Sequence, residues 1–356
     1  MRHIKLLTIL LLVIFLVTAV AVAGGCTKKP APKPLPGTPG AVVKPPRMVI
    51  GYYENPWPGT PEKTGSFPSM KTFGKSMSAV GPFWYKATAD GTLETKDSQQ
   101  VLDAAKGMGL KIFPLVTNKT GATDAVLGDP ATRTKVTDNI VKVVQDKGYD
   151  GINIDFELLP PKHRDNLTAF MAELYPKLKK LNKTLIISVF PQVDVAEDVS
   201  GAYNYPELAK NADFLQIMLY DRHWATSEPG AIAPLDWYEK NLKYSIDNGG
   251  GAQKIIAGVS AYGYNWKKGG EGETIIYADA IALADQHGAK IMYDDKAQAP
   301  HFSYGNHEVW FENKESTAAK LDVVAKYDPA GIAVWRIGQE QPEIWQVIDQ
   351  KFPKQQ

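Results

Sequence analysis

From residue 48 onward the sequence alternates between short apolar segments and longer amphipathic ones, and this alternation limits the fold more than any other feature. The short segments are rich in β-branched and aromatic residues, and Gly, Asn, Asp or Pro follows them. Such alternation is typical of parallel strands, because a parallel connection needs a crossover of a dozen or more residues. The predicted strands are 48–53, 79–84, 111–116, 151–156, 185–190, 214–219, 255–260 and 331–335.

The amphipathic segments complete repeated strand–helix units. Helices are predicted at 98–108, 130–147, 162–181, 237–248 and 316–327. Eight such units in roughly 310 residues fit an α/β fold of the (β/α)8 TIM-barrel type better than an open doubly wound sheet. The chain has no Gly-x-Gly-x-x-Gly turn and no P-loop, which removes the main support for a nucleotide-binding α/β fold.

The last two predicted strands are separated by about 70 residues, which is too many for a single helical crossover. Within that gap, 290–293 and 307–311 have the composition of additional strands. We therefore predict a small α+β insertion between strands 7 and 8, at about 265–313. It is expected at the carboxyl rim, where barrels build their ligand sites.

The segment 150–157, Asp-Gly-Ile-Asn-Ile-Asp-Phe-Glu, is the strongest candidate for chemistry. Side chains alternate along a strand, so Asn153, Asp155 and Glu157 share one face and the apolar residues share the other. In a barrel the apolar face of a strand packs against the helices. The three polar side chains then point into the barrel, with Glu157 nearest the carboxyl end of the strand. Burial and a neighbouring carboxylate both raise a carboxyl pKa, so Glu157 is a candidate general acid. The alternative is that these polar side chains only form hydrogen bonds with one another and have no catalytic role.

Charge argues against a nucleic acid as the ligand, and aromatic content favours a sugar or a protein surface. Residues 1–47 contain no acid, and the remainder carries 33 Lys and Arg against 39 Asp and Glu, a net charge of −6. A domain of that sign is a poor nucleic-acid binder, since binding depends on neutralising phosphates. The 8 Trp and 16 Tyr supply flat apolar faces with polar edges, which suit sugar rings or protein surfaces. The 6 His form no close metal set, and we expect neither metal nor cofactor.

The amino terminus has the composition of an export segment. A short basic start precedes an uncharged apolar run at 6–23, and small residues then precede Cys26, the chain's 1 cysteine. This pattern resembles a bacterial lipobox, which implies a lipoprotein-type signal at 1–25 and lipidation of Cys26. The alternatives are a signal anchor or a secreted protein with a free cysteine. The Pro- and Lys-rich segment 26–47 is predicted to be an extended linker between the membrane and a barrel at 48–356.

The motif at 150–157 resembles the DxxDxDxE signature of glycoside hydrolase family 18, the chitinase-like hydrolases. Similar likenesses lie at 216–221 (QIMLYD), 261–266 (AYGYNW) and 333–338 (AVWRIG), so the resemblance covers nearly all of 48–356. The segments 82–85, 89–91 and 309–312 resemble the bacterial branch that contains spore-cortex and peptidoglycan N-acetylglucosaminidases. Asn153 stands where the chitinase signature has Asp, which also resembles that branch.

The resemblance implies substrate-assisted retaining hydrolysis, an exception to the usual two-carboxylate scheme. It implies that Glu157 is the acid and base, that Asp155 and Asn153 orient the substrate acetamido group, and that Tyr220 donates to its oxygen. Trp335 is then the floor of the sugar site and Asp221 a hydroxyl contact. The other candidate substrate-binding residues are Gln216, Met218, Tyr52, Trp84 and Tyr262.

We therefore expect an exported, membrane-tethered, monomeric hydrolase of β-1,4 linkages in N-acetylglucosamine-containing glycans, with peptidoglycan favoured. Two alternatives remain open at this stage. One is a chitinase or an endoglycosidase that acts on N-glycans. The other is a non-catalytic sugar-binding protein on the same barrel, although that class normally arises by loss of the acid, and Glu157 is present.

Overall fold

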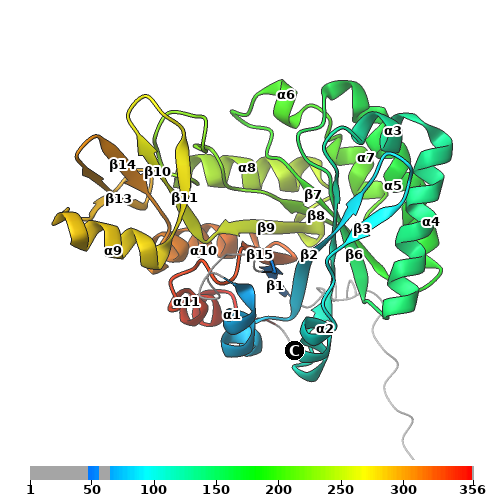
Figure 1. Ribbon diagram of the computed structural model, residues 1–356, viewed down its shortest axis with the longest axis horizontal. Coiled ribbons are helices and arrows are strands. Elements are labelled where there is room, and N and C mark those ends of the chain that lie inside the picture. The colour runs from blue at the N-terminus through cyan, green and yellow to red at the C-terminus, as the bar shows by residue number, and fades with distance from the viewer. Residues whose placement is uncertain (1–46, 56–64, 355–356) are drawn as a thin grey trace, which may run out of the picture. The chain divides into compact units, whose positions relative to one another are not determined.

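Parallel strands pair edge to edge around a closed ring in which the last strand meets the first (Figure 1). The computed structural model describes residues 47–55 and 65–354. β1 pairs in parallel with both β15 and β2, and this double pairing closes the barrel. In ring order the strands are β1 (Met48–Tyr53), β15 (Gly331–Trp335), β9 (Ile255–Ser260), β8 (Phe214–Ile217), β7 (Thr184–Val189), β6 (Gly151–Asp155), β5 (Leu115–Asn118) and β2 (Ala79–Ala87).

The predicted (β/α)8 barrel is confirmed, with one difference in the third predicted strand. The segment 111–116 is not continuous but divides into β4 (Lys111–Ile112) and β5. Pro114 lies in the break, where it has no N–H to donate to a ladder. β3 (Leu93–Thr95), which the sequence did not indicate, adds to β2 in the antiparallel direction.

Helices connect most of the barrel strands, and local sequence signals mark both ends of one of them. α4 (Pro130–Lys147) begins where Asp129 accepts a hydrogen bond from the Thr132 N–H, with Pro130 at the first position, and it ends at left-handed Gly148. The other helices outside the insertion are α1 (Ser66–Phe73), α2 (Gln99–Gly107), α3 (Thr123–Gly128), α5 (Arg164–Lys179), α6 (Glu197–Ser200), α7 (Tyr205–Lys210), α8 (Leu235–Asn248), α10 (Lys314–Tyr327) and α11 (Ile344–Lys351). Single 3-10 turns lie at Gly74–Ser76, Pro161–His163 and Ala252–Lys254.

Between β9 and β15 the chain forms a second, antiparallel sheet, shown in yellow and orange in Figure 1. This is the position predicted for an α+β insertion. One helix, α9 (Tyr277–His287), packs on the sheet and shares a small core with it, which includes Ala280, Phe302 and Phe311. In sheet order the strands are β11 (Gly272–Ile276), β10 (Tyr262–Lys267), β14 (His307–Trp310), β13 (Ala299–Tyr304) and β12 (Met292–Asp294).

The barrel strands separate two apolar layers, and this separation decides which side chains reach the site. Ile152, Ile154 and Phe156 belong to the layer between strands and helices, where the Phe156 ring lies 5.1 Å from that of Phe170 in α5. A separate cluster that includes Tyr52 and Leu115 fills the barrel interior. The polar residues of β6 therefore face the interior, as alternation predicts.

The predicted export segment, Cys26 and the predicted linker up to residue 46 lie outside the described residues. Within 47–55 and 65–354, no helix combines the length and the apolar composition needed to cross a membrane.

Candidate active site

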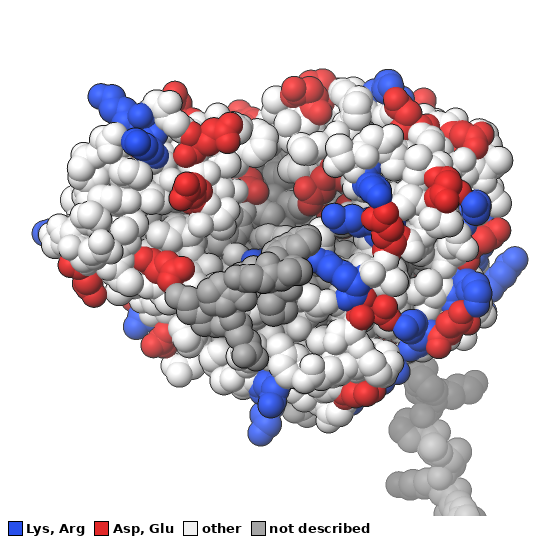
Figure 2. Space-filling view, viewed as in Figure 1, with Lys and Arg blue, Asp and Glu red and all other residues white. Residues whose placement is uncertain are grey.

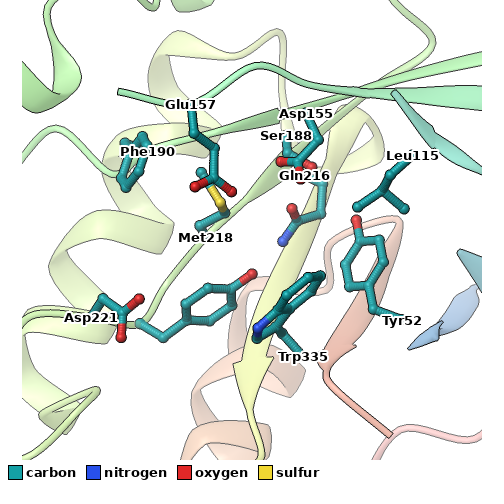
Figure 3. A pocket seen from close by; sticks show the side chains of 11 residues that line it. Tyr52, Leu115, Asp155, Glu157, Ser188, Phe190, Gln216, Met218, Asp221 and Trp335 are labelled. Carbon is teal, nitrogen blue, oxygen red and sulfur yellow. The ribbon is translucent and has the colours of Figure 1, made fainter. Parts of the chain in front are cut away.

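A cavity of about 130 Å³, here called the inner cavity, opens where the barrel strands end (Figure 3). Its walls come from the carboxyl ends of several strands and the loops after them. Glu157 and Asp155 enter from the end of β6, and Trp335 lies on the other side of the space. The lining residues are Tyr52, Leu115, Asp155, Glu157, Ser188, Phe190, Gln216, Met218, Tyr220, Asp221 and Trp335.

Asp155 and Glu157 are close enough to share a hydrogen bond between their carboxyl groups. Burial raises the pKa of Asp155 to about 6, although hydrogen bonds from Ser188 and Glu157 oppose the change. Burial also raises the pKa of Glu157 well above its usual range, and the negative charges of Asp155 and Asp221 add to the effect. Glu157 therefore holds its proton to a higher pH than an ordinary glutamate and can donate it to a group in the cavity.

The backbone of Glu157 is held from the neighbouring strand by Asn118, which the sequence did not single out. The Glu157 N–H donates to Asn118 Oδ1 at 2.9 Å, and Asn118 Nδ2 donates to the Glu157 carbonyl at 3.1 Å. Asn118 is the last residue of β5, and β5 pairs with β6. These two hydrogen bonds fix the backbone of Glu157 just after the end of β6.

Asn153 lies below the cavity rather than in its wall. Its side chain is 1% exposed, and its Nδ2 donates to the Tyr52 hydroxyl at 2.8 Å and to Ser188 Oγ at 3.0 Å. Ser188 in turn hydrogen-bonds Asp155. Asn153 therefore supports two residues that line the cavity, Tyr52 and Ser188, and reaches Asp155 through the second of them.

Asp221 reaches the cavity from an unusual backbone conformation and is held by two phenols. Its φ is 58°, in the left-handed region, and its Oδ1 accepts from the hydroxyls of Tyr262 at 2.5 Å and Tyr264 at 3.2 Å. Burial raises its pKa to about 6, against the effect of these two hydrogen bonds. Tyr262 does not line the inner cavity, so it acts on the site by holding Asp221.

Tyr220 and Gln216 approach the cavity from β8 and the loop after it. Burial is the main cause that raises the Tyr220 pKa far above its usual range, so its hydroxyl remains a donor. Gln216 is fully buried, and its Oε1 has no hydrogen-bond partner among the described residues. Gly258 of β9 leaves room for both, because a Cβ there would lie 2.9 Å from Tyr220 Cε1 and 3.0 Å from Gln216 Nε2.

Trp335 and Met218 complete the inner cavity. Trp335 ends β15, is half-buried, and has its ring 5.5 Å from that of Tyr52 and 6.1 Å from that of Phe83. Its position opposite the two carboxyls places a flat apolar surface where a sugar ring can stack. Met218 lies between Glu157 and Gln216 in the same wall (Figure 3).

A second, larger cavity of about 420 Å³ continues past Glu157 and is here called the outer cavity. It shares Glu157, Phe190, Tyr220 and Asp221 with the inner cavity. Its remaining residues come from the loops after β6, β7 and β8 and from α6 and α8, and they are Leu158, Pro191, Asp194, Val195, Ala196, Asp198, Val199, Arg222, Trp224, Ser227 and Trp237. Glu157 therefore stands at the junction of the two cavities.

Trp84, a candidate wall residue, lines neither cavity and contacts none of the residues of the site described above. It is 2% exposed and packs 6.2 Å from the Tyr149 ring, on the helix side of β2. Alternation along β2 explains this placement, because Trp84 has the parity of Val80, which also faces the helices. Phe83 has the opposite parity and contacts Trp335 instead.

Sequence reasoning missed the outer cavity and most of the supporting residues of the inner one. Ser188 and Leu115 stand in predicted strands on the interior face, so alternation could have found them. Arg222 and Trp224 lie in a loop, where no repeating sequence pattern indicates which way a side chain points. In residues 47–55 and 65–354, no group of three or more His, Cys, Asp or Glu could hold a metal ion.

Residues 48–340 match the family model described as Glycosyl hydrolases family 18. The chain is 29% identical over 318 residues to the uncharacterized glycosylase YvbX of Bacillus subtilis, over 85% of this chain and 90% of that protein. Its structure is similar to that of the spore cortex-lytic enzyme SleL of Bacillus cereus, with a TM-score of 0.78 and 26% identity over 86% of this chain and 74% of that one. A chitinase from Chromobacterium violaceum gives a TM-score of 0.77 and 30% identity over 87% of this chain and 100% of that one. The chain therefore belongs to glycosyl hydrolase family 18 and is a glycosidase.

Proposed function

We propose that this glycosidase cleaves β-1,4 bonds beside N-acetylglucosamine by substrate-assisted retaining catalysis. The observation that carries the proposal is Glu157 at the junction of the two cavities, with Asp155 beside it in the inner cavity and Trp335 on the opposite side. Glu157 donates its proton to the glycosidic oxygen while the substrate's acetamido oxygen attacks the anomeric carbon. The bond to the leaving sugar breaks, and an oxazolinium ion remains in the inner cavity. Glu157 then accepts a proton from the water that opens this ion.

The neighbouring groups are placed to assist the acetamido group. Asp155 lines the cavity beside Glu157 and is suited to accept the acetamido N–H and to stabilise the positive charge that develops on the ring. The Tyr220 hydroxyl lines the same space and remains protonated, so it can donate to the acetamido oxygen. Asn153 supports this set from below through Ser188.

We favour peptidoglycan as the substrate. SleL is named a spore cortex-lytic enzyme, and YvbX a glycosylase. Asn153 supports the same choice, since the sequence resembles the peptidoglycan-acting branch at that position. Chitin is the second candidate, because the chain is 30% identical to a protein named a chitinase.

Product analysis separates the two substrates. The soluble domain from residue 48 onward would be incubated with purified peptidoglycan and with N-acetylglucosamine oligomers, and the fragments identified by mass spectrometry. We expect faster release of fragments from peptidoglycan. Release from the oligomers alone would move the assignment to chitin, and release from neither would contradict the glycosidase mechanism.

A thiazoline analogue of the oxazolinium ion is expected to inhibit competitively. It matches the intermediate in shape and charge, and transition-state-like ligands bind about 10²-fold or more tightly than substrates. The measurement is the inhibition constant relative to KM. The control is an analogue of the same sugar that lacks the fused ring and so does not resemble the oxazolinium ion. Equal inhibition by both compounds would argue against attack by the acetamido group.

We also propose that the enzyme is exported and tethered to the outer face of the membrane by lipid on Cys26. The support is the small residues before this cysteine and the Pro- and Lys-rich segment after it. Cys26→Ser is expected to move the protein from the membrane fraction to the soluble fraction and to abolish labelling by a fatty-acid probe. A variant that keeps its label or its membrane association would remove Cys26 from this role.

A further inference from the structure

A buried ion pair lies where the chain leaves the inserted sheet and returns to the barrel. Glu312 follows β14 by two residues, and Lys320 belongs to α10. Lys320 Nζ donates to Glu312 Oε2 at 2.7 Å, and the two side chains are 0% and 2% exposed. Charges of both signs lie interspersed on the face seen in Figure 2, where exposed ion pairs contribute little to stability. A buried pair is different, because removing two charges from water costs free energy that their attraction must offset.

The Glu312 carboxylate also reaches the place where the chain enters the inserted sheet. Its Oε1 accepts a hydrogen bond from Ser260 Oγ at 3.3 Å, and its Oε2 accepts one from Ser316 Oγ at 2.5 Å. Ser260 is the last residue of β9, and β10 begins two residues later. A Cβ on Gly263 would lie 2.2 Å from the Trp310 carbonyl oxygen, so the entering and leaving strands are in close contact. One carboxylate therefore joins the entrance and the exit of the inserted sheet to α10.

The segment from Ser260 to Tyr262 leads directly to the inner cavity. The Ala261 N–H donates to the Trp335 carbonyl at 2.8 Å, and Ser260 is the register partner of Trp335 between β9 and β15. The Tyr262 hydroxyl donates to Asp221 Oδ1 at 2.5 Å. Trp335 and Asp221 both line the inner cavity. A shift of this segment would therefore move two residues of the cavity wall.

Stability alone is a weak reason for this buried pair. Well-packed apolar side chains in place of a buried ion pair often leave a protein equally stable or more stable. Apolar side chains cannot hold the Ser260 hydroxyl, because that group needs an acceptor at hydrogen-bond distance and in line with its O–H. The contact that the site depends on is then the one from Glu312 to Ser260, and Lys320 keeps the carboxylate in place to make it.

We propose that Glu312 is a positioning residue of the active site: held by Lys320, it fixes the segment 260–262 and, through that segment, Trp335 and Asp221. Glu312 lines neither cavity, so it acts through other residues and not on the substrate itself. This inference rests on the proposed function, since it assumes that the inner cavity holds the reacting sugar.

Two double variants separate the contact from the charges. In Glu312→Gln/Lys320→Met, here called the glutamine variant, both charges are removed but the side-chain amide can still accept from Ser260. In Glu312→Leu/Lys320→Met, the leucine variant, the acceptor is removed as well. We expect kcat of the leucine variant to be about tenfold below that of the glutamine variant, because a misplacement of about 1 Å can cost about 10²-fold. Ser260→Ala removes only the donor and should also lower kcat, to a value between these two.

The pH dependence of kcat gives a readout that a loss of stability would not move. The negative charge of Asp221 adds to the rise in the pKa of Glu157. In the leucine variant Asp221 is held less firmly, so the pKa of Glu157 should fall and the alkaline limb should move to lower pH. The control is Arg133→Met/Glu173→Leu, which removes a partly buried ion pair between α4 and α5 that lines neither cavity. It should keep the wild-type kcat and alkaline limb.

Hydrogen exchange of the Ala261 amide, followed by NMR, tests the positioning without turnover. This amide should exchange faster in the leucine variant and in Ser260→Ala than in the glutamine variant. The Asn153 amide, which donates to the Pro114 carbonyl within the barrel, serves as the internal reference and should keep its rate.

Equal kcat values in the two double variants, or equal exchange rates at Ala261, would overturn the inference. An alkaline limb that stayed in place in the leucine variant would overturn its extension to Asp221. If the leucine variant does not fold, Ser260→Ala decides, and wild-type exchange at Ala261 in that variant would count against Glu312. If the wild type cleaves no glycan, the proposed function fails, whereas the exchange rates still test whether Glu312 holds the segment 260–262.

Discussion

Replacing Glu157 with Gln is expected to lower kcat by about 10³-fold while leaving substrate affinity almost unchanged. The amide has nearly the same shape as the acid but has no proton to give to the leaving oxygen, and general acid–base catalysis contributes about 10² to 10⁴-fold. Binding should survive because Trp335 and Gln216 are unchanged and the amide keeps the shape of the side chain that lines both cavities. Stability should rise slightly or stay the same, since a raised pKa means that burial already disfavours the charged carboxylate.

The measurements are single-turnover rates and the affinity for an N-acetylglucosamine oligomer. Glu271→Gln makes the same chemical change at an exposed acid that lines neither cavity, so it should behave as the wild type. If Glu157→Gln kept more than about a tenth of the wild-type rate, a factor small beside those of general acids, another group would have to supply the proton.

Replacing Asp155 with Asn is expected to lower kcat by about 10²-fold and also to shift its pH dependence. The loss in rate follows from losing a negative charge beside the developing cation. The shift in pH dependence follows because the negative charge of Asp155 raises the pKa of Glu157. Without that charge the pKa of Glu157 falls, so its proton is lost at a lower pH. The alkaline limb of the kcat profile should therefore move toward lower pH.

A full pH–kcat profile checks this prediction, with Asp285→Asn as the control at an exposed position outside both cavities. The control should keep the wild-type profile. An alkaline limb that stayed in place in Asp155→Asn would mean that Asp155 does not influence the proton of the acid. A limb that moved to higher pH would reverse the electrostatic argument altogether.

The barrel could be predicted because its signals are local and repeated. A period of two in 151–157 was enough to place Asp155 inward and Phe156 against α5. The error at 111–116 came from reading an apolar run without weighing Pro114, which cannot donate to a ladder. Trp84 was assigned by resemblance, although the parity of β2 directs it to the helices.

The site could be predicted only where its residues stand on strands. Asn118 holds Glu157 through two hydrogen bonds across neighbouring strands, and no spacing in the sequence indicates that pairing. The outer cavity depends on loops after three different strands, including Leu158, Val195 and Arg222. The path of a loop depends on tertiary packing and not on a repeating pattern in the sequence. The sequence could therefore indicate the residues of the inner cavity but not the outer cavity.

The two phenols that hold Asp221 make the appended sheet inseparable from the chemistry. Tyr262 and Tyr264 belong to β10, the first strand of that sheet in the chain, yet their hydroxyls donate to Asp221, which lines the inner cavity. An engineer who trimmed 262–310 to obtain a minimal scaffold would remove both donors at once. The shortened enzyme would keep every barrel strand, but the charge of Asp221 near Glu157 would no longer be held in place. The inserted sheet is therefore needed by the site and cannot be exchanged as a separate module.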